Sequence, residues 1–551
     1  MSAEQIAHLL QQARDWAGED PDAQTREELV AAIAAVEAGG DSAQLADAFR
    51  TTLQFGTAGL RGALGAGPNR MNRVVVLRAA AGLVAYLRAQ GAGPEDAVVI
   101  GYDARHNSEV FARDTAEVVA GAGLRALLLP RHLPTPVLAF AIRDLGAVAG
   151  VMVTASHNPP QDNGYKVYLG DGSQIVPPAD VEIATQIAAV GALGSVPRVN
   201  LVTVLGESVV EHYLDAVAGL ADDGPRDLTL VYTPLHGVGN DVALQVLERA
   251  GFPAPHVVAS QRDPDPDFPT VAFPNPEEPG AMDAALALAA EVDADLVLAN
   301  DPDADRCAAA VKGPHGWRML RGDEVGALLG SALLRKGRTG TYAASIVSSS
   351  LLGKLAAAHG QEYVETLTGF KWIGRLPGLA FGYEEALGYC VDPDHVKDKD
   401  GVSALLLLSM LAAEAKADGR TLVDLLDEIA REHGLHATDQ LSVRVTDLAE
   451  IDRAMARLRE HPPTSLADLE VLAVDDLALG SPELPPTDGL RYRLADGARV
   501  IVRPSGTEPK IKCYLEVVIG VEPGGDVDAA RISAAGRLDA LRNAIAEAAG
   551  L

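Results

Sequence analysis

The sequence is poor in cysteine and in long apolar runs, and both shortages exclude classes of protein. The three cysteines among the 551 residues, Cys307, Cys390 and Cys513, show neither metal-ligand nor redox spacing, so we expect a reduced, cytoplasmic chain. The most apolar interior run, 404–413, has about half of the roughly 20 residues that a membrane-spanning helix needs. The first residues predict an amphipathic surface helix and not a signal peptide, because no basic start precedes a long apolar stretch.

Positive charge is scarce as well. The 46 Lys and Arg residues are outnumbered by 76 Asp and Glu residues, which gives a formal net charge of −30. A negative field of this size repels nucleic acids and anionic membrane surfaces, so we expect neither as a partner. An anionic small molecule could bind only where a few Lys and Arg side chains, backbone N–H groups and a bound cation outweigh the global field.

Short apolar runs alternate with longer segments of helical periodicity along most of the chain. In one unit, the strand-like run 97–103 is followed by a polar loop, a helical segment that ends in glycine, and a second apolar run. This order is typical of α/β units with parallel strands, and similar units begin near 227 and 339. After an N-terminal helical extension, the sequence therefore predicts three related α/β domains.

The C-terminal part has a different pattern, with several strand-like runs and a long terminal helical segment. It predicts a smaller α+β domain whose sheet is covered on one side. The whole chain is too long for one hydrophobic core, and its length suggests about three or four domains. We place their boundaries at 1–218, 219–321, 322–439 and 440–551.

The segment TASHNPPQDNGYKVY follows a strand-like run and contains the first candidate catalytic group, Ser156. A serine at a strand end, on a loop stiffened by Pro159 and Pro160, can accept a phosphoryl group and later return it. The transfer requires a base for the hydroxyl proton and cations for the developing charge. Read alone, the segment is explained equally well as an Asn-Pro turn that happens to contain Ser and His.

The three aspartates of DPDADR alternate directly after another apolar run. Such alternation can aim carboxylates at one point, and hard oxygen ligands on a short loop favour Mg²⁺. Arg306 can relieve part of the negative charge and reach a phosphate oxygen. A solvated acidic turn or a calcium loop is the alternative, but the glycine-centred calcium-loop pattern is absent. A metal site formed by Asp301, Asp303 and Asp305 is therefore favoured.

Two further motifs could bind a sugar phosphate. In GYEEALGY, Glu384 and Glu385 can accept hydrogen bonds from vicinal sugar hydroxyls, although a plain surface turn is the simpler interpretation. The residues that follow could bring Lys397 and Lys399 to the same cleft. RPSGTEPK is a turn that offers a guanidinium, hydroxyls and backbone N–H groups to a phosphate dianion, with an ordinary hairpin turn as the alternative. Its candidate ligands are Arg503, Ser505, Gly506, Thr507 and Lys510.

Two glycine-containing segments complete the set of motifs. QFGTAGLRGALGAG surrounds Arg61 with glycines that allow close approach of the backbone to a ligand, unless the segment is only a flexible linker. TPLHGVGN, at 233–240, lacks the G-x-G-x-x-G spacing of a dinucleotide loop, so nucleotide binding is not favoured.

Taken in order, TASHNPPQDNGYKVY, DPDADR, GYEEALGY and RPSGTEPK closely resemble motifs of the alpha-D-phosphohexomutase superfamily, in particular its phosphoglucomutase/phosphomannomutase members. FGTAGLRG and TGFKWIG extend the resemblance over roughly 50–520. The resemblance implies an α/β fold of four domains around a central cleft, three of them related α/β domains with mixed sheets and the last α+β. The pair Glu385-Ala386 departs from the Gly-Glu-x-Ser-Gly loop of many bacterial relatives and is more similar to the phosphoglucomutase/phosphopentomutase branch.

The resemblance also implies a role for each motif. Ser156 would carry the phosphoryl group, and a phosphoserine oxygen would complete a magnesium site with the three aspartates of DPDADR. The glutamates of GYEEALGY would bind the sugar hydroxyls, and the loop 503–507 would hold the phosphate that is not reacting. The candidates for proton transfer and charge stabilisation are His157, Lys166, Arg61 and Lys371.

The sequence therefore predicts a phosphosugar mutase that interconverts hexose 1-phosphate and hexose 6-phosphate, with glucose as the expected sugar. Mg²⁺ is the expected cofactor, and glucose 1,6-bisphosphate the expected intermediate and activator. A mannose- or pentose-specific mutase is the alternative within the family. A phosphatase with an aspartyl nucleophile leaves SHNPP and RPSGTEPK unexplained, and a non-catalytic sugar-phosphate sensor needs no phosphorylatable serine. We expect small-molecule sugar phosphates as partners, and a monomer or a dimer.

Overall fold

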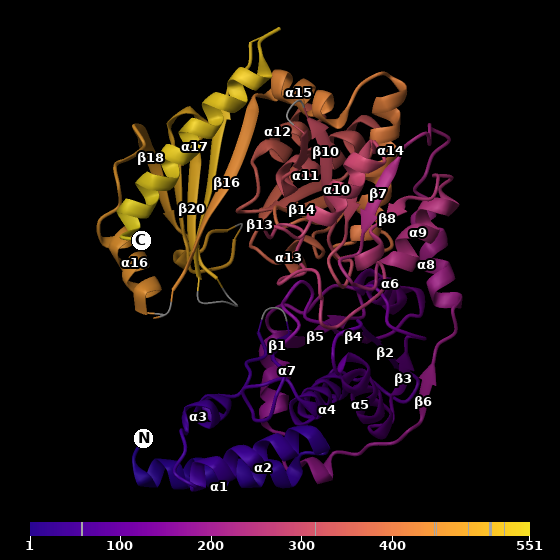
Figure 1. The fold of residues 1–551 in the computed structure, drawn as a ribbon, viewed down its shortest axis with the longest axis vertical. Helices are drawn as coiled ribbons and strands as arrows, with labels where there is room; N and C mark the ends of the chain where they lie inside the picture. The colour runs from indigo at the N-terminus through magenta and orange to yellow at the C-terminus, as the bar shows by residue number, and fades with distance from the viewer. Residues whose placement is uncertain are drawn as a thin grey trace. The chain divides into compact units, whose positions relative to one another are not determined.

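The computed structural model describes residues 1–56, 59–313, 316–445, 447, 449–482, 484–505, 510–522 and 524–551. The chain forms two compact units (Figure 1). The first unit consists of Met1–Met319 and Gly388–Glu414, and the second of Leu320–Leu387 and Ala415–Leu551. Among the described residues, every helix falls short of the length and apolar character that crossing a membrane requires.

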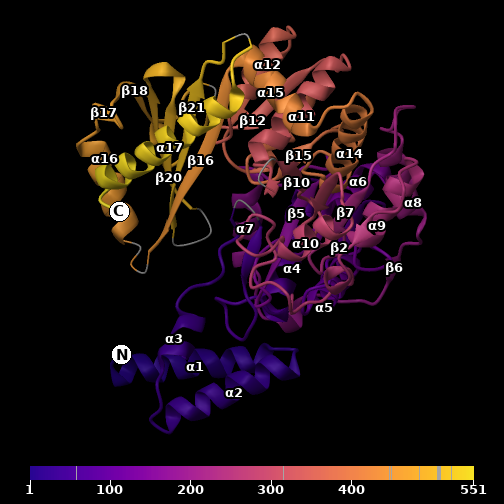
Figure 2. The ribbon, with the colours of Figure 1, turned by 45° about the horizontal axis from the view of Figure 1, so that its top comes forward.

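The first unit begins with three helices, α1 (Ala3–Glu19), α2 (Ala23–Glu37) and α3 (Ala43–Phe49). Leu9, Leu10 and Ala13 of α1 are buried in a small apolar core with residues of α2 and α3, which confirms the predicted amphipathic helix. The side chains of Ser2 and Gln5 form a capping box that satisfies backbone N–H groups at the start of α1. Figure 2 shows α1 and α2 side by side.

A six-stranded mixed sheet follows, with the strand order β1-β5-β4-β2-β3-β6. The strands β4, β2, β3 and β6 are parallel, whereas β5 runs antiparallel to both β4 and β1. Their bounds are β1 (Leu60–Ala63), β2 (Ala97–Tyr102), β3 (Arg125–Leu128), β4 (Ala149–Val153), β5 (Asp162–Leu169) and β6 (Val202–Val204). The helices are α4 (Arg73–Ala89), α5 (Ser108–Gly121), α6 (Thr135–Asp144), α7 (Ala179–Ala188) and α8 (Ser208–Ala218). The α/β unit predicted from 97 is confirmed.

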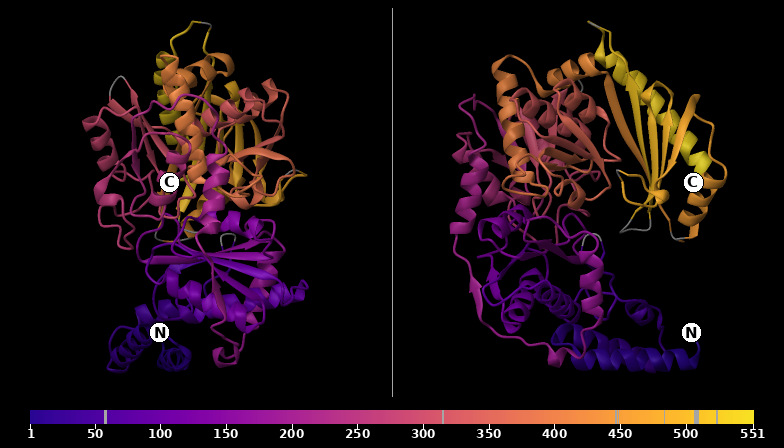
Figure 3. Two further views of the ribbon diagram at one scale, coloured as in Figure 1. Left: turned by 90° about the vertical axis from the view of Figure 1, so that its right-hand side faces the viewer. Right: turned by 180° about the vertical axis from the view of Figure 1, so that it is seen from behind.

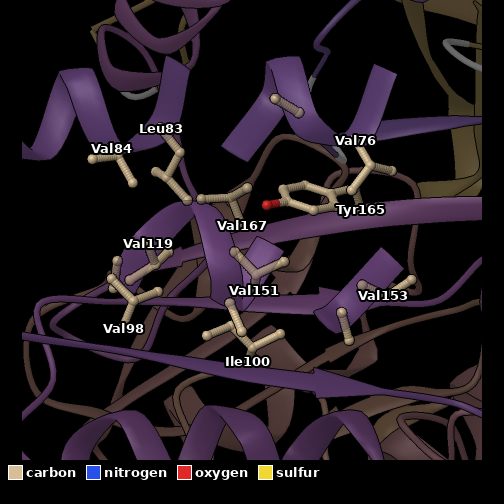
Figure 4. Close-up of a cluster of buried hydrophobic side chains, with 14 of the residues drawn as sticks. Val76, Leu83, Val84, Val98, Ile100, Val119, Val151, Val153, Tyr165 and Val167 are labelled. Carbon is tan, nitrogen blue, oxygen red and sulfur yellow. The ribbon is translucent and has the colours of Figure 1, made fainter. Parts of the chain in front are cut away.

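One face of this sheet is packed against α4 and α5 through a buried apolar core (Figure 4). Val98, Ile100 and Val151 from the sheet meet Leu83 of α4 and Val119 of α5. Burial of apolar side chains of this size stabilises the fold by about 1.5–3 kcal/mol each, so the sheet is a rigid support for the loops at its strand ends.

The strand β5 shows how this core orients a polar side chain. Tyr165 and Val167 turn into the core (Figure 4). Because successive side chains point to opposite faces of a strand, Lys166 between them is directed away from that core. The buried neighbours therefore determine where the lysine ammonium lies.

The second sheet of the first unit has five strands in the order β11-β10-β9-β7-β8. Its strands β8, β7 and β9 are parallel, and β10 and β11 are antiparallel. The bounds are β7 (Leu230–Thr233), β8 (His256–Val257), β9 (Leu296–Ala299), β10 (Ala308–Gly313) and β11 (Gly316–Met319), with helices α9 (Asn240–Arg249) and α10 (Asp283–Glu291). The segment 388–414 returns to this unit with β15 (Gly388–Cys390) and most of α14 (Gly401–Ala417).

The second unit contains a parallel sheet with neighbouring strands β13-β12-β14 and a six-stranded antiparallel sheet in the order β16-β21-β20-β19-β18-β17. In Figure 3, α17 lies along one face of the antiparallel sheet, as predicted for the C-terminal α+β domain. The strands are β12 (Thr341–Ser345), β13 (Glu362–Thr366), β14 (Leu379–Glu384), β16 (Leu435–Arg444), β17 (Ser465–Leu466), β18 (Leu469–Asp476), β19 (Leu490–Leu494), β20 (Arg499–Pro504) and β21 (Lys510–Ile519). The helices are α11 (Gly322–Arg335), α12 (Leu351–Ala358), α13 (Phe370–Ile373), α15 (Leu422–His433), α16 (Ala449–Glu460) and α17 (Val527–Ala549).

Candidate active site

Ser156 and the DPDADR segment meet within the first unit. Ser156 lies just after β4, and its Oγ donates a hydrogen bond to Oδ2 of Asp301, 2.8 Å away. The same Oγ lies 3.1 Å from Nδ1 of His157. The serine side chain is buried, with 3% of its surface exposed. A potential nucleophile, a nitrogen base and a carboxylate therefore share one enclosed site.

The loop that carries Ser156 is held by a single guanidinium, that of Arg105. One of its terminal nitrogens donates to the carbonyl oxygens of Pro159 and Asp162, at 2.9 and 3.2 Å. The other donates to the carbonyl oxygens of Ser156, at 2.6 Å, and of Asn158. The planar guanidinium thus satisfies four carbonyls of one loop, which a smaller cation could not do.

Arg105 is itself fixed from two sides. Its Nε lies 3.3 Å from Oδ2 of Asp103, and the guanidinium carbon lies 4.9 Å from the centroid of the Phe268 ring. Such contacts leave Arg105 little freedom. Ser156 in turn is held at φ 52°, in the left-handed region that a serine rarely adopts.

The three aspartates of DPDADR converge on one point. Side-chain oxygens of Asp301, Asp303 and Asp305 all lie within 4.8 Å of one another, and all three residues are fully buried. Oδ1 of Asp303 and Oδ1 of Asp305 are buried without a hydrogen-bond partner among the described residues. Buried carboxylate oxygens of this kind are suitable ligands for a hard divalent cation.

Three cations surround these carboxylates. Nζ of Lys166 lies 2.7 Å from Oδ2 of Asp303 and 2.8 Å from Oδ2 of Asp305. Nζ of Lys399 lies 3.1 Å from the same oxygen of Asp305. Nε of Arg306 is farther away, 3.8 Å from Asp301 and 3.9 Å from Asp305.

The two lysines act unequally on the three carboxyl groups. Burial and the charges of Asp303 and Asp305 raise the pKa of Asp301 well above its ordinary value. Burial also opposes ionisation of Asp305, but Lys166 and Lys399 outweigh it and hold the pKa of Asp305 far below its usual range. Burial of Lys166 disfavours its charged form, but the charges of Asp303 and Asp305 outweigh burial and raise its pKa. Lys166 is therefore a cation at neutral pH.

His157 and Arg61 complete this part of the site. Burial, with the charges of Arg306 and Arg61, lowers the pKa of His157 well below its ordinary value, so its imidazole is neutral at pH 7. One terminal nitrogen of Arg61 donates to Oδ1 of Asn158, at 3.2 Å. The structure therefore brings together the following predicted residues: Ser156, His157, Lys166, Arg61, Asp301, Asp303, Asp305, Arg306 and Lys399.

Lys399 owes its position to the aspartates beside it. Asp398 accepts hydrogen bonds from the hydroxyl of Tyr168, at 2.8 Å, and from the side-chain amide of Gln174, at 2.7 Å. Asp400 accepts one from the hydroxyl of Tyr213, at 2.9 Å. These anchors fix the segment from which Lys399 reaches Asp305. The other predicted lysine of this segment, Lys397, is half-buried.

The predicted sugar loop and Lys371 belong to the second unit. Oε1 of Glu384 accepts a hydrogen bond from the backbone N–H of Gly369, at 2.7 Å. Oε2 of Glu385 lies 3.1 and 3.2 Å from the hydroxyls of Ser345 and Ser348. Lys371 is buried, with its Nζ 5.2 Å from the centroid of the Trp372 ring.

The predicted phosphate loop lies between β20 and β21 of the same unit. The backbone N–H of Ser505 donates to the carbonyl oxygen of Lys510, at 2.8 Å, which closes the hairpin. Burial and the charges of Glu385 and Glu384 raise the pKa of Tyr514, against the effect of Arg503. Tyr514 therefore lies near both the sugar loop and Arg503. Gly506 and Thr507, also predicted here, lie outside the described residues.

Two contacts of the DPDADR loop had no signal in the sequence analysis. The hydroxyl of Thr135, at the start of α6, donates to Oδ2 of Asp303, at 2.7 Å. The TPLHGVGN segment packs directly against the same loop. A Cβ atom added at Gly237 would lie only 2.3 Å from Cα of Pro302, so a larger residue would not fit there. Gly237 is thus explained by close backbone packing. The role of Arg105 was also missed, because the four carbonyls that it binds lie more than 50 residues away in the sequence.

Comparison with protein families matches all four parts of the chain to phosphoglucomutase/phosphomannomutase models. Alpha/beta/alpha domains I, II and III match residues 52–192, 211–316 and 321–433. The C-terminal domain of the family matches residues 441–525.

Curated relatives cover nearly the same length. A "Probable phosphomannomutase" of Haemophilus influenzae is 51% identical over 81% of this chain and 93% of its own. A phosphoglucomutase of Staphylococcus epidermidis is 36% identical over 86% and 92%, and a phosphopentomutase of Mus musculus is 34% identical over 98% and 94%. A solved structure of a "putative phosphomannomutase" from Thermus thermophilus has a TM-score of 0.70 at 26% identity, and the match covers 89% of this chain and 99% of that one.

The four-domain α/β fold and these relatives define a phosphomutase, an enzyme that moves a phosphoryl group between two positions of a sugar phosphate. The chain belongs to the phosphoglucomutase/phosphomannomutase family. The predicted family and fold class are therefore confirmed. The alternatives of a phosphatase and of a non-catalytic sensor are not supported.

The Arg105 contacts lead to a first prediction. Arg105→Lys should lower kcat for mutase turnover about 10²-fold while the protein stays folded, because one ammonium cannot hold four carbonyls and a displaced serine misaligns the reacting atoms. Initial rates and circular dichroism test this. Arg113→Lys, at an exposed pair with Glu109 on the following helix, is the matched control. Equal kcat values for the two variants would contradict the role of Arg105.

Proposed function

We propose that this enzyme interconverts glucose 1-phosphate and glucose 6-phosphate through phosphoserine at position 156 and a glucose 1,6-bisphosphate intermediate. The observation that carries the proposal is the hydrogen bond between Ser156 and Asp301 within a buried cluster of three carboxylates and three cations. This is an enclosed site in which a serine hydroxyl can hold a phosphoryl group between turnovers. The domain boundaries at 218, 321 and 439 and the individual site roles are part of the same proposal.

In the first half of the reaction, phosphorylated Ser156 gives its phosphoryl group to the free hydroxyl of the bound sugar monophosphate. The bond from phosphorus to the serine oxygen breaks, and a bond from phosphorus to the sugar oxygen forms. The proton of the sugar hydroxyl passes to a base, and the departing serine oxygen takes up a proton. The bisphosphate then turns end for end. In the second half, Oγ of Ser156 forms a bond to the other phosphorus and its proton passes to the base. The bond from that phosphorus to its sugar oxygen breaks, and the sugar oxygen takes up a proton to become a free hydroxyl.

Of the residues predicted for proton transfer, we assign the serine proton to His157, which Oγ can reach once it no longer donates to Asp301. Its Nδ1 lies 3.1 Å from Oγ of Ser156, within hydrogen-bond reach. Lys166 and Arg306 remain cationic and stabilise charge on the transferred group. Arg61 shares that task.

Mg²⁺ fits the residues present. Asp301, Asp303 and Asp305 would hold it together with an oxygen of the phosphoserine, and the partnerless Oδ1 atoms of Asp303 and Asp305 are the donors that such an ion needs. When bound, the ion would polarise the phosphoryl oxygens and neutralise charge that develops on them. Lys166 and Thr135 orient Asp303 by their hydrogen bonds to its Oδ2.

In the second unit, we assign Glu384 and Glu385 to the sugar hydroxyls, and the loop 503–507 with Lys510 to the phosphate that is not reacting. Lys371 stays a candidate for proton transfer and charge stabilisation. The carboxylates can accept hydrogen bonds from vicinal hydroxyls, and Arg503 can bind a phosphate through a planar pair of N–H groups. Two phosphate positions are required because each end of the bisphosphate must occupy the reacting position in turn.

Ser156→Ala should abolish the interconversion of glucose 1-phosphate and glucose 6-phosphate and leave the fold intact, because no other group is proposed to carry phosphate. Intact-protein mass spectrometry after incubation with glucose 1,6-bisphosphate should show one added phosphoryl group on the unmodified enzyme and none on the variant. Ser195→Ala, an exposed serine of the same domain, is the control. Retained turnover in Ser156→Ala would rule out the phosphoserine.

Asp303→Asn should weaken Mg²⁺ binding, measured by titration calorimetry, by about 10²-fold or more, since even outer-shell changes cost 10- to 100-fold. Mutase activity should fall with it and should also be lost in excess chelator. Asp293→Asn, at an exposed ion pair with Lys312, should bind Mg²⁺ as the unmodified enzyme does. Full activity without divalent ions would overturn the metal assignment.

Sugar preference has its own test. Glucose 1-phosphate should give a higher kcat/KM than mannose 1-phosphate or ribose 1-phosphate when each is assayed with its bisphosphate activator. Glucose and mannose differ in the direction of one hydroxyl, and a site built to hydrogen-bond a hydroxyl discriminates strongly against a substrate that leaves its polar groups unpaired. A higher value for mannose or for the pentose would replace glucose as the substrate without changing the mutase mechanism.

A further inference from the structure

The loop 346–350, between β12 and α12, separates two polar groups of the second unit. On one side lies Glu385 of the proposed sugar loop. On the other side lies an ion pair on the antiparallel sheet, formed by Arg499 of β20 and Glu516 of β21. Each group is bound to the same short loop, so the loop connects them.

Glu385 is bound to this loop through Ser348. The backbone N–H of Glu385 donates to Oγ of Ser348, at 2.9 Å, and the same hydroxyl lies 3.2 Å from Oε2 of Glu385. Ser345, at the end of β12, lies 3.1 Å from that oxygen. Both serines are fully buried. The position of the Glu385 carboxylate therefore depends on where Ser348 lies.

Ser348 in turn is held by Arg499. One terminal nitrogen of Arg499 donates to the carbonyl oxygen of Ser348. The other donates to the carbonyl oxygen of Ile346, at 3.3 Å, and to Glu365, at 3.1 Å. Arg499 is 9% exposed, and such a buried guanidinium leaves its partners unsatisfied if it is removed.

Glu516 holds the opposite end of the loop. It accepts hydrogen bonds from the hydroxyl of Ser349, at 2.6 Å, and from the backbone N–H of Ser350, at 2.9 Å. Burial opposes its ionisation, but Arg499 and His436 hold the pKa of Glu516 well below its ordinary value. The ion pair is therefore charged at neutral pH. Arg499 donates to carbonyl oxygens of the loop, and Glu516 accepts hydrogen bonds from it.

The same strand also carries the proposed phosphate ligand. Arg499 and Arg503 are four residues apart on β20, so both point to the same face of the sheet. Tyr514 of β21 lies on this face too, opposite Ile501. One strand thus presents a phosphate ligand and the residue that holds the sugar loop.

The neighbouring Ser350, His436 and Glu516 do not form a catalytic triad. Both the hydroxyl of Ser350, at 3.2 Å, and the carboxylate of Glu516, at 2.9 Å, contact the same ring nitrogen, Nδ1. A triad needs the two ring nitrogens to be used separately. The group is structural, and its role is to hold the loop.

We propose that Arg499 is a positioning residue for the sugar site, acting through Ser348 on the Glu385 carboxylate. The inference rests on the proposed function, because it assumes that Glu385 binds the sugar. It adds that binding of the sugar and the position of the antiparallel sheet are coupled: a displacement of β20 that breaks the contact of Arg499 with Ser348 would also loosen the sugar loop.

The test measures binding of glucose 6-phosphate by calorimetry in the Ser156→Ala background, so that turnover does not interfere. Arg499→Lys and, separately, Ser348→Ala should each raise Kd about 10-fold, because each leaves a buried hydrogen-bonding group of the loop unpaired. Arg491→Lys is the matched control. Arg491, on β19 of the same sheet as Arg499, pairs with Glu365 of β13, at 2.9 Å, but donates to no residue of the 346–350 loop in the described structure. It should leave Kd unchanged.

A double-mutant cycle separates positioning from general stability. In a Glu385→Gln background, Arg499→Lys should cost much less than it does alone, since its effect passes through that carboxylate. Additive effects, or an unchanged Kd in both Arg499→Lys and Ser348→Ala, would overturn the inference. Should the Ser156→Ala protein itself bind no hexose phosphate, the proposed function fails and the inference falls with it.

Discussion

The first unit has to stabilise three carboxylates that are buried away from water, those of Asp301, Asp303 and Asp305. Two like charges about 4 Å apart repel by about 4 kcal/mol at an effective dielectric constant of about 20, so the cluster is stable only with cations beside it. Lys166, Lys399 and Arg306 supply them from three different segments of the chain. The negative charge of the DPDADR loop is therefore balanced only when the first sheet, the second sheet and the segment 388–414 are all folded. The site thus depends on the whole first unit.

The charged side chains of the site can converge because the backbone of the serine loop and of the DPDADR loop is tightly held. Ser156 and Ala304 both adopt left-handed φ values, 52° in each case, and such residues cost of order 1–3 kcal/mol unless their surroundings determine them. Arg105 determines the serine loop by its contacts with four carbonyls, and Gly237 allows the neighbouring loop to pack directly on Pro302. The Ser156 hydroxyl, which we propose to carry the phosphoryl group, is thus positioned by contacts of its backbone.

The fold class and the motif residues could be predicted from the sequence because their signals are local: strand-like runs, the SHNPP turn and the alternating aspartates each lie within a few residues. The roles of Arg105, Thr135 and Arg499 could not, since each depends on partners more than 50 residues away. Lys399 illustrates the same limit. The sequence suggested a ligand for the substrate, which stays a prediction, but it gave no signal for the contact between its ammonium and Asp305. Such pairings depend on how distant segments of the chain pack together, and a single sequence does not reveal this packing.

The balance of charge also explains how so acidic a chain can handle phosphate. With all three aspartates ionised, the charges of Lys166, Lys399 and Arg306 cancel theirs, which leaves no surplus for a phosphoserine of charge about −1.5 to −2. Arg61 contributes one further positive charge, which balances only part of the charge of a phosphoserine. A divalent cation would supply the missing charge, and the partnerless carboxylate oxygens of Asp303 and Asp305 would hold it. The phosphorylated serine and the metal are therefore expected to stabilise each other, and neither is well accommodated in the cluster alone.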